Sequence, residues 1–598
     1  MPTLLWGLTI TNYVLYSGNL KSKGVLVFVR IKRDKNSDRR RIQVVENTRI
    51  GKRVKQKIIR HVGIAYNDLE EQKMKDLGEY IVANEISKSQ SLLYSPETLA
   101  ELAIEARKIS AKKELKVDLL KLVEEQRVVL GVHEVLGEVY KTLGFNELLG
   151  ARRKASEKNL YHVTMARLAN PVSKRATVRD LAQDFGTQID ISAVYRMMDH
   201  IDEKVIEKTR TLAYESAAKL FGEKLELVFY DCTTLYFESF SEDDLRKNGF
   251  SKDLKFNQPQ IVLGLVATKE GIPIDYEVFP GNTFEGNTVE RAIDQIKNKY
   301  NIDKVVFVAD SAMIKIPNQA YFEKNGLHYI IAARLKNMPR KWKEKILSPI
   351  EEFTTTSNSE STTYDRIREW DYPGKWKNPE TKEEVELSRR LVVTYSTKRA
   401  KKDRLDRDKG VAKLRKKLKN EKNLKSYLSN SGYKRFLEAS EDTDLIINEE
   451  KIEQAAKWDG LHGVITNIPF NEMNLEDVAN RYREQWQIEE CFRISKHDLR
   501  MRPIFHWSPQ RVRAHIMICF IALVCIRHLS YRVKLRYEPM SAARIIRELK
   551  TVQASILRHT ETNDRYVIPS SVSLDAKKIY NTMAIKTGTT PYEVTTSR

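Results

Sequence analysis

Two aspartates and one glutamate stand where a carboxylate could do chemistry: Asp231, Asp310 and Glu489. Asp231 and Asp310 close two short apolar runs, KLELVFYD and IDKVVFVAD, each of which predicts a buried strand. Carboxylates on neighbouring strand ends can share Mg²⁺ or Mn²⁺ ions, and two cations about 3.5 to 4 Å apart catalyse phosphoryl transfer. An aspartate after a strand is also common as a turn residue or helix cap, so either residue alone would favour a structural role.

Glu489 lies in the charged stretch RYREQWQIEECFRISKHDL, residues 481–499. At about 100° per residue, one face of a helix here would carry Tyr482, Gln485, Trp486, Glu489, Arg493 and Lys496. Glu484 and Glu490 lie away from the centre of this face, which favours Glu489 as a third metal ligand. Basic groups on the same face could then pair with phosphate oxygens. The alternative is an ordinary i, i+4 ion pair between Glu489 and Arg493, which would be the simpler explanation of this helix taken alone.

The elements that must position these acids follow from the pattern of residues 224–310. Three strand-like runs, the amphipathic segment TVERAIDQIKNKY and a fourth strand give the order βββαβ. In a sheet of the ribonuclease H type, the first and fourth strands are neighbours, which would place Asp231 beside Asp310. Glu489 would come from a long helix that begins near Asn474. The expected fold class is therefore α/β, with a ribonuclease H-like catalytic core.

The rest of the chain surrounds this core, which is expected at residues 221–310 and 475–535. The predicted remainder is an N-terminal extension at 1–24, a basic strand-rich segment at 25–65, a helical DNA-binding region with few strand signals at 66–220, a β-rich and basic insertion at 311–474, and a C-terminal region at 536–598 that could serve dimerisation.

The formal net charge of +22 indicates a polyanionic partner, most simply nucleic acid. Residues 30–60 hold 13 Lys or Arg against 3 Asp or Glu, which favours a phosphate-binding surface over a solvated hairpin. Residues 398–425 hold 14 against 4, and here a solvated coil and a DNA contact are about equally favoured. The four cysteines show neither disulfide nor zinc spacing, which fits a reducing cytoplasm.

Membrane association is not expected from the apolar pattern. No apolar run reaches the roughly 18 residues that a membrane span needs. The nearest run, IMICFIALVCI at residues 516–526, predicts a buried helix.

Three motifs together resemble those of the DDE transposases of bacterial insertion sequences, in the insertion sequence four-like branch with a Tyr-x2-Arg-x3-Glu-x6-Lys signature. The signature positions here are Tyr482, Gln485, Glu489 and Lys496. The segments YDCTTLYFES, FPGNTFEGNT and VVFVADSAM are also similar to that family, and the similarity covers roughly residues 25–560. One position departs, because Gln485 stands where the branch has arginine.

The resemblance implies that Asp231, Asp310 and Glu489 bind two Mg²⁺ or Mn²⁺ ions and that Tyr482 and Lys496 contact phosphates. Gln485 and Trp486 share their face and are expected at the DNA, and Arg493 could replace the missing arginine. The implied reaction is cleavage of double-stranded DNA at terminal inverted repeats, followed by transfer of the 3′ end into target DNA. The implied setting is a homodimer on DNA in the bacterial cytoplasm.

Two other functions stay open at this point. One is a ribonuclease H-like nuclease or resolvase that cuts DNA without strand transfer. The other is a DNA-binding relic without activity. DNA joining separates the first from a transposase, and the effect of Asp231→Asn on cleavage separates the second.

Overall fold

In the computed structural model of the chain, the described residues are 25–33, 40–50, 53–65, parts of 68–82, 117–221, 225, 227–238, 241–249, 258–291, 306–309, 314–355, 364–420, 432–439 and 445–594. Three predictions therefore fall wholly or largely outside the described residues: the extension at 1–24, the position of Asp310 and the helix expected at 288–300. The chain divides into two compact units, Met1–Val117 and Asp118–Arg598.

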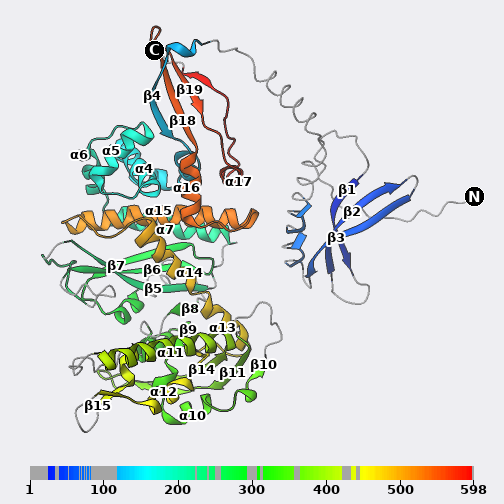
Figure 1. Ribbon diagram of the computed structural model, residues 1–598, viewed down its shortest axis with the longest axis vertical. Coiled ribbons are helices and arrows are strands. Elements are labelled where there is room, and N and C mark those ends of the chain that lie inside the picture. The colour runs from blue at the N-terminus through cyan, green and yellow to red at the C-terminus, as the bar shows by residue number, and fades with distance from the viewer. Residues whose placement is uncertain are drawn as a thin grey trace, which may run out of the picture. The chain divides into compact units, whose positions relative to one another are not determined.

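The first unit contains a three-stranded antiparallel sheet. Its strands are β1 (Val25–Arg33), β2 (Arg40–Ile50) and β3 (Arg53–Ala65), in that order (Figure 1). Ile42, Val44 and Val45 of the central strand are fully buried. Some of the basic residues are neutralised within the unit, since Arg40 pairs with Asp68 and Glu71.

The second unit is organised around a nine-stranded mixed sheet of order β10-β11-β14-β17-β9-β8-β5-β6-β7. One half consists of β5 (Leu227–Tyr236), β6 (Gln260–Thr268), β7 (Pro273–Pro280), β8 (Val306–Ala309) and β9 (His328–Ala333). β5, β6 and β7 are antiparallel neighbours, whereas β8 runs parallel to both β5 and β9. The predicted adjacency of the first and fourth strands is thus confirmed. β6 is buried along its whole length, which explains its continuous apolar sequence.

The other half of the sheet comes from residues 354–466. Its strands are β10 (Thr354–Thr355), β11 (Arg366–Asp371), β14 (Arg390–Tyr395) and β17 (Leu461–Thr466). β17 pairs with β9 through Gly463 to Thr466, so the strands of the predicted insertion extend the same sheet. Around them lie α9 (Ile316–Lys324), α10 (Arg340–Ile346), α12 (Glu449–Ala456) and two small hairpins, β12 (Gly374–Lys377) with β13 (Glu384–Leu387) and β15 (Leu437–Ala439) with β16 (Leu445–Ile447).

The basic stretch for which a solvated coil and a DNA contact are about equally favoured forms a helix, α11 (Thr397–Asn420), so the coil is wrong there and the DNA contact stays a prediction. Lys, Arg and Leu are strong helix formers, and this propensity prevails over the charge density that suggested a coil. Two i, i+4 ion pairs, Arg399 with Asp403 and Arg404 with Asp408, add support. Val411 and Leu414 are buried and attach the helix to the rest of the unit. Residues 421–425 of this stretch lie outside the described part.

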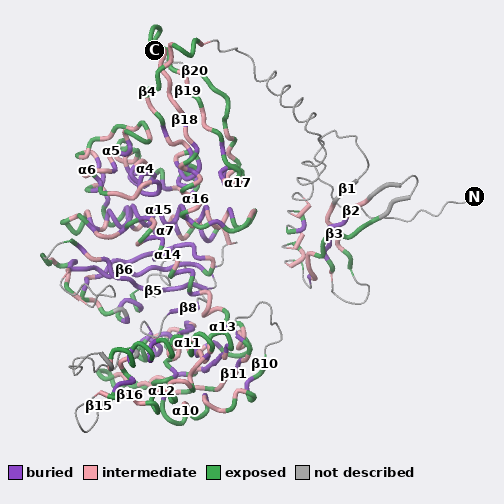
Figure 2. The backbone as a smooth tube through the Cα atoms, viewed as in Figure 1, coloured by how far each residue is buried: buried purple, intermediate pink, exposed green. Residues whose placement is uncertain are grey.

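Helices cover the β5 to β7 side of the sheet. They are α3 (Gly137–Thr142), α4 (Lys154–Ala169), α5 (Lys174–Phe185), α6 (Ile191–Asp199), α7 (Glu203–Leu220) and α15 (Pro509–Arg536). α7 and α15 both pack on β7. Figure 2 shows that burial is concentrated in α15 and in strands β5 and β6. Among the described helices, α15 alone is apolar and long enough to cross a membrane, yet 89% of its most apolar 18-residue window is buried inside the protein.

The C-terminal residues form a second sheet with an unexpected partner. Its order is β20 (Tyr592–Val594), β19 (Arg565–Pro569), β18 (Gln553–His559) and β4 (Leu122–Val129). β4 lies in the region expected to be helical with few strand signals, and this expectation needs correction. The local pattern is weak because β4 is the edge strand of this sheet among the described strands, and the strand it pairs with, β18, is far away in sequence.

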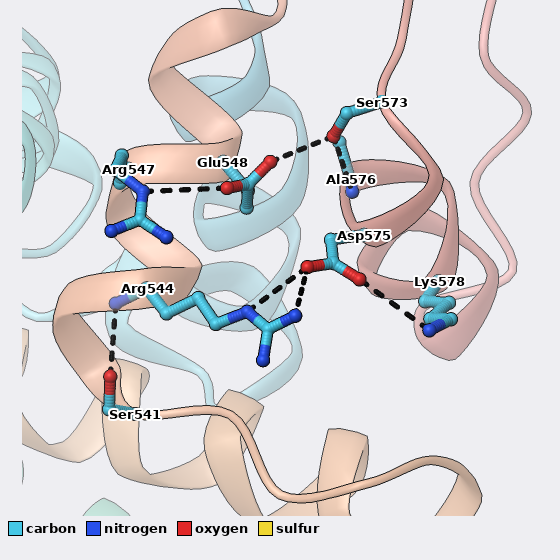
Figure 3. Close-up of polar contacts among 8 residues, drawn as sticks. All are labelled: Ser541, Arg544, Arg547, Glu548, Ser573, Asp575, Ala576 and Lys578. Atoms are coloured by element: carbon cyan, nitrogen blue, oxygen red, sulfur yellow. Dashed lines mark hydrogen bonds and ion pairs between the residues drawn. The ribbon is translucent and has the colours of Figure 1, made fainter.

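Two helices accompany this sheet, α16 (Ala542–Thr551) and α17 (Leu574–Thr582). Ser541 and Ser573 cap their N-termini. Arg544 pairs with Asp575, and Ser573 donates to Glu548 at 2.8 Å, so polar contacts join the two helices (Figure 3). Both helices also pack on α15.

Candidate active site

Asp231 is the fifth residue of β5 and therefore lies within the strand rather than at its end. The strand continues past Asp231 because residues 232–236 stay paired with β6, whereas the described pairing with β8 stops at Phe229 and Val308. The Asp231 side chain is half-buried, and its Oδ1 accepts a hydrogen bond from the Cys232 backbone N–H at 2.7 Å. Asp231 is thus fixed two residues beyond the last described β5–β8 pair, Phe229 with Val308.

The side chain of Asp231 points to a defined face of the sheet. Leu227, Phe229 and Leu235 share its face because strand side chains alternate. These three residues pack in the same apolar cluster as Ile488 and Cys491. Cys232, on the opposite face, has its thiol 3.3 Å from Thr288 Oγ1. On this face of the sheet the potential metal ligand is therefore the Asp231 carboxylate, and the Cys232 thiol lies on the opposite face.

The helix that carries Glu489 is not continuous. The predicted long helix consists of α13 (Leu475–Arg483), α14 (Trp486–Arg493) and a π-helical turn, Ile494–Asp498. At the first joint, Gln485 N–H donates to Tyr482 O and Gln487 N–H donates to Glu484 O, both with three-residue spacing. The chain is overwound there and underwound after Arg493. The angle between residues on opposite sides of a joint therefore differs from a sum of uniform 100° steps.

α14 is held firmly against the strand of Asp231. It packs on both β5 and β6, and Ile488 and Cys491 are fully buried. The Cys491 thiol donates to Gly271 O at 3.3 Å, and Gln487 accepts from Arg527 at 2.9 Å. Glu489 is consequently presented from a rigid helix on the same sheet face as Asp231.

Four of the six residues expected on one helix face line a single cavity of about 220 Å³. They are Tyr482, Gln485, Trp486 and Glu489, and the other lining residues are Thr394, Ser396, Arg399, Gly460, His462 and Arg483. Arg493 and Lys496 are not among the lining residues. The cavity thus lies between the α13–α14 joint and the ends of β14 and β17.

The ion pair considered as the simpler explanation of the helix is wrong. Arg493 pairs with Glu490 at 2.6 and 2.7 Å and with Asp498 at 3.3 Å. Hydrogen bonding to Arg493 lowers the pKa of Glu490. Glu489 is exposed, and its carboxylate has no hydrogen bond or ion pair within the described residues. Glu489 is therefore available to a ligand, whereas Arg493 already has two acidic partners.

Six cavity residues were not predicted from the sequence, and three of them have ionisable side chains: Arg399, His462 and Arg483. The His462 ring lies 5.3 Å from that of Tyr482, and burial, reinforced by the two arginines, lowers the pKa of His462 to about 4. Arg399 comes from α11 and could not be placed from its sequence position. Arg483 could have been recognised from the sequence. It is a cation two residues before Gln485, the position at which the transposase signature that the sequence resembles has arginine.

The potential metal ligands in this part of the chain suit a hard divalent cation. Asp231 and Glu489 offer carboxylate oxygens, which Mg²⁺ and Mn²⁺ prefer. Among the described residues, which do not include Asp310, no three His, Cys, Asp or Glu side chains are grouped so that they could hold a metal ion. A three-ligand metal site here would therefore need a ligand from outside the described residues.

A family model described as the transposase DDE domain matches residues 225–525. Among solved structures, a piggyBac transposase synaptic complex with hairpin DNA is similar with a TM-score of 0.34 and 9% identity, covering 70% of this chain and 76% of that one. A Mos1 transposase paired-end complex with the left transposon end has a TM-score of 0.12 and 14% identity, covering 26% and 53%. Both TM-scores are too low to establish a shared fold. No curated protein matches the sequence.

Proposed function

The chain belongs to the transposase DDE domain family, and on this premise we propose that it cuts DNA at insertion-sequence ends and transfers them into target DNA by two-metal phosphoryl transfer. The observation that carries the proposal is the packing of α14, which bears Glu489, on the face of β5 that carries Asp231. The proposal includes a ribonuclease H-like core and membership of the bacterial insertion sequence four-like branch.

The position of the third acid, Asp310, is inferred from the register of β5 and β8. β5 and β8 pair in parallel, with Phe229 opposite Val308. Asp231 follows Phe229 by two residues, and Asp310 follows Val308 by two residues. The two aspartates are therefore proposed as neighbours at the same level of the sheet.

In this proposal Asp231, Asp310 and Glu489 hold two Mg²⁺ or Mn²⁺ ions. When bound, the cations would activate the attacking oxygen and stabilise the leaving oxygen. The β5–β6 pairing and the Cys232 N–H fix the orientation of Asp231. Glu489 has no competing cation within hydrogen-bonding distance in the described chain, so its charge is free for a ligand.

DNA would approach along the cavity beside Glu489. Tyr482 and Lys496 are proposed to contact phosphates, and Trp486, which is 55% exposed, offers an aromatic face to the DNA. Gln485 lines the same cavity with a neutral amide and is only 7% exposed. The basic residues of the 25–220 region are proposed to bind the terminal repeats, in a homodimer on DNA within the bacterial cytoplasm.

A joining assay tests the proposal. Labelled duplexes made from the DNA that flanks the gene are incubated with purified full-length protein, Mg²⁺ and an unlabelled target duplex. We expect cut ends to become joined to the target, EDTA to stop the reaction, and Asp231→Asn to abolish cleavage while DNA binding is retained. Cleavage without joining would indicate a nuclease or resolvase instead. Binding that is never followed by cleavage would indicate a relic.

A further inference from the structure

Two arginines lie on the wall of the cavity that contains Glu489. Arg399 belongs to the first turn of α11, which Ser396 caps, and Arg483 is the last residue of α13. The two side chains therefore come from the extended part of the sheet and from the helical segment that precedes Glu489. Neither arginine belongs to the signature that the sequence suggested.

The charges of the two arginines are poorly compensated. Arg483 is half-buried, lies 4.6 Å over the Tyr364 ring and has no ion pair within the described residues. Burial lowers the pKa of Arg483, and the charge of Arg399 adds to this effect. The acidic partner of Arg399 is Asp403 at 3.7 Å, in a pair whose side chains are 55% and 36% exposed. Solvent screens such a pair, so the repulsion between the two arginines is only weakly offset.

The remaining lining offers polar groups without compensating charge. Thr394, Ser396 and Tyr482 carry hydroxyl groups, and His462 is neutral at physiological pH. Glu489 is the only acid among the described lining residues, and it forms no ion pair with either arginine. A bound anion would offset the repulsion between the two arginines and accept a hydrogen bond from Ser396, whereas the Thr394 hydroxyl already donates to His462 O at 3.4 Å.

We infer that Arg399 and Arg483 form a phosphate-binding site for one phosphodiester of the DNA strand presented to Glu489. This inference rests on the proposed function. The site supplies the cationic contact that Gln485 lacks, and it makes the substitution of Arg493 for the missing arginine unnecessary. The cavity of about 220 Å³ is smaller than the roughly 300 to 1,000 Å³ of sites that enclose small molecules, which fits part of a longer strand.

Chemical modification locates the contact without any need for catalysis. Full-length protein is treated with phenylglyoxal in EDTA, with and without the flanking-DNA duplex, and modified arginines are identified by mass spectrometry. DNA should protect Arg399 and Arg483, whereas Arg340, which is 93% exposed on α10, should react equally in both samples. Equal modification of Arg399 and Arg483 with and without bound DNA would overturn the inference.

Substitutions measure the size of the contact. Dissociation constants for the duplex are measured in EDTA over a series of salt concentrations. Arg483→Gln and Arg399→Gln should each weaken binding about tenfold. Each should also reduce the salt slope, which is the slope of log K against log salt concentration, by roughly one. Arg483→Lys should retain most of the slope because the charge remains, although the planar donor fork is lost. Arg340→Gln serves as the control, and unchanged thermal midpoints show that the variants are folded.

The outcomes separate this inference from the proposed function. A reduced slope for Arg493→Gln, with none for Arg483→Gln, would overturn the inference and leave the transposase proposal intact. Protected arginines in a protein that binds the duplex but never cleaves it would defeat the proposed function and retain the phosphate site.

Discussion

Arg493 binds Glu490 at 2.6 Å and leaves the adjacent Glu489 without an ionic partner in the described chain. Two neighbouring glutamates therefore differ in what they can do. Glu489→Gln should lower DNA cleavage about 10²-fold or more, as loss of an electrostatic group at a reacting centre does. Glu490→Gln should leave cleavage within about twofold, because it removes only a partly exposed pair. Initial rates with one labelled duplex measure both, and equal losses would contradict the assignment.

The ion pair between Arg210 of α7 and Asp275 of β7 should be important for stability. The two side chains are 5% and 3% exposed, and Asp275 is the closest acidic partner of Arg210, whose pairs with Glu207 and Glu277 are longer, at 3.5 and 3.6 Å, so its loss there is costly. Asp275→Ala should reduce the free energy of unfolding by about 3 kcal/mol, measured by urea denaturation. Glu344→Ala breaks the exposed pair with Arg340 and should have little effect. Similar losses in the two variants would show that burial is not the deciding factor.

Gly460 lines the cavity beside Glu489 and has a backbone conformation that other residues rarely adopt. Its φ is +78°, and a Cβ there would lie 2.7 Å from Ser396 O and 2.8 Å from Ala400 Cβ. Gly460→Ala should cost at least about 1 to 2 kcal/mol of stability from the backbone alone. Gly326 has a φ of +63° in open space, so Gly326→Ala isolates this backbone cost. The thermal midpoint should be lower for Gly460→Ala than for Gly326→Ala. Equal midpoints would show that contact of the new Cβ with Ser396 and Ala400 does not destabilise the fold.

Lys174 should make stability rise with pH. Burial, followed by the charge of Arg167, lowers the pKa of Lys174 from 10.5 to about 7 in the folded protein. Between these values the unfolded chain binds more protons than the folded one, so folding becomes more favourable as pH increases. Relative to Lys174→Met, the wild type should gain up to about 1.4 kcal/mol per pH unit between pH 7 and 10.

Urea denaturation at a series of pH values checks this slope. Lys577→Met, at an exposed position on α17, is the matched control and should show no such difference. Parallel curves for wild type and Lys174→Met would mean that Lys174 does not carry the effect.

The strand arrangement around Asp231 could be predicted because buried strands carry continuous apolar runs and because the order βββαβ limits which strands can be neighbours. β4 could not be recognised, since the stability of this edge strand comes from β18, more than 400 residues later. α11 was obscured by its own charge, although its helix-forming composition was visible in the sequence.

The candidate site was predictable only in part. A regular helix brings Tyr482, Gln485, Trp486 and Glu489 to one face, and the structure places these four residues in one cavity. Arg493, one turn after Glu489 in the same helix, is not among the lining residues and pairs with Glu490 and Asp498 instead. Arg399 and His462 reach the cavity only through the pairing of β14 with β17, where Thr394 lies opposite His462. That contact between distant segments leaves no local trace in the sequence.

The continuity of the nine-stranded sheet limits where residues can be removed from this protein. Excising residues 334–460 would remove β14 and expose the edge of β17, whose Val464 and Ile465 are buried. An exposed apolar edge strand is a template for aggregation, so the truncated protein should be insoluble. The β12–β13 hairpin lies outside the large sheet. Deletions, tags or fused modules are best placed in this hairpin. It lies outside the hydrogen-bonded strands that connect the Arg399 side of the sheet to β5, which carries Asp231.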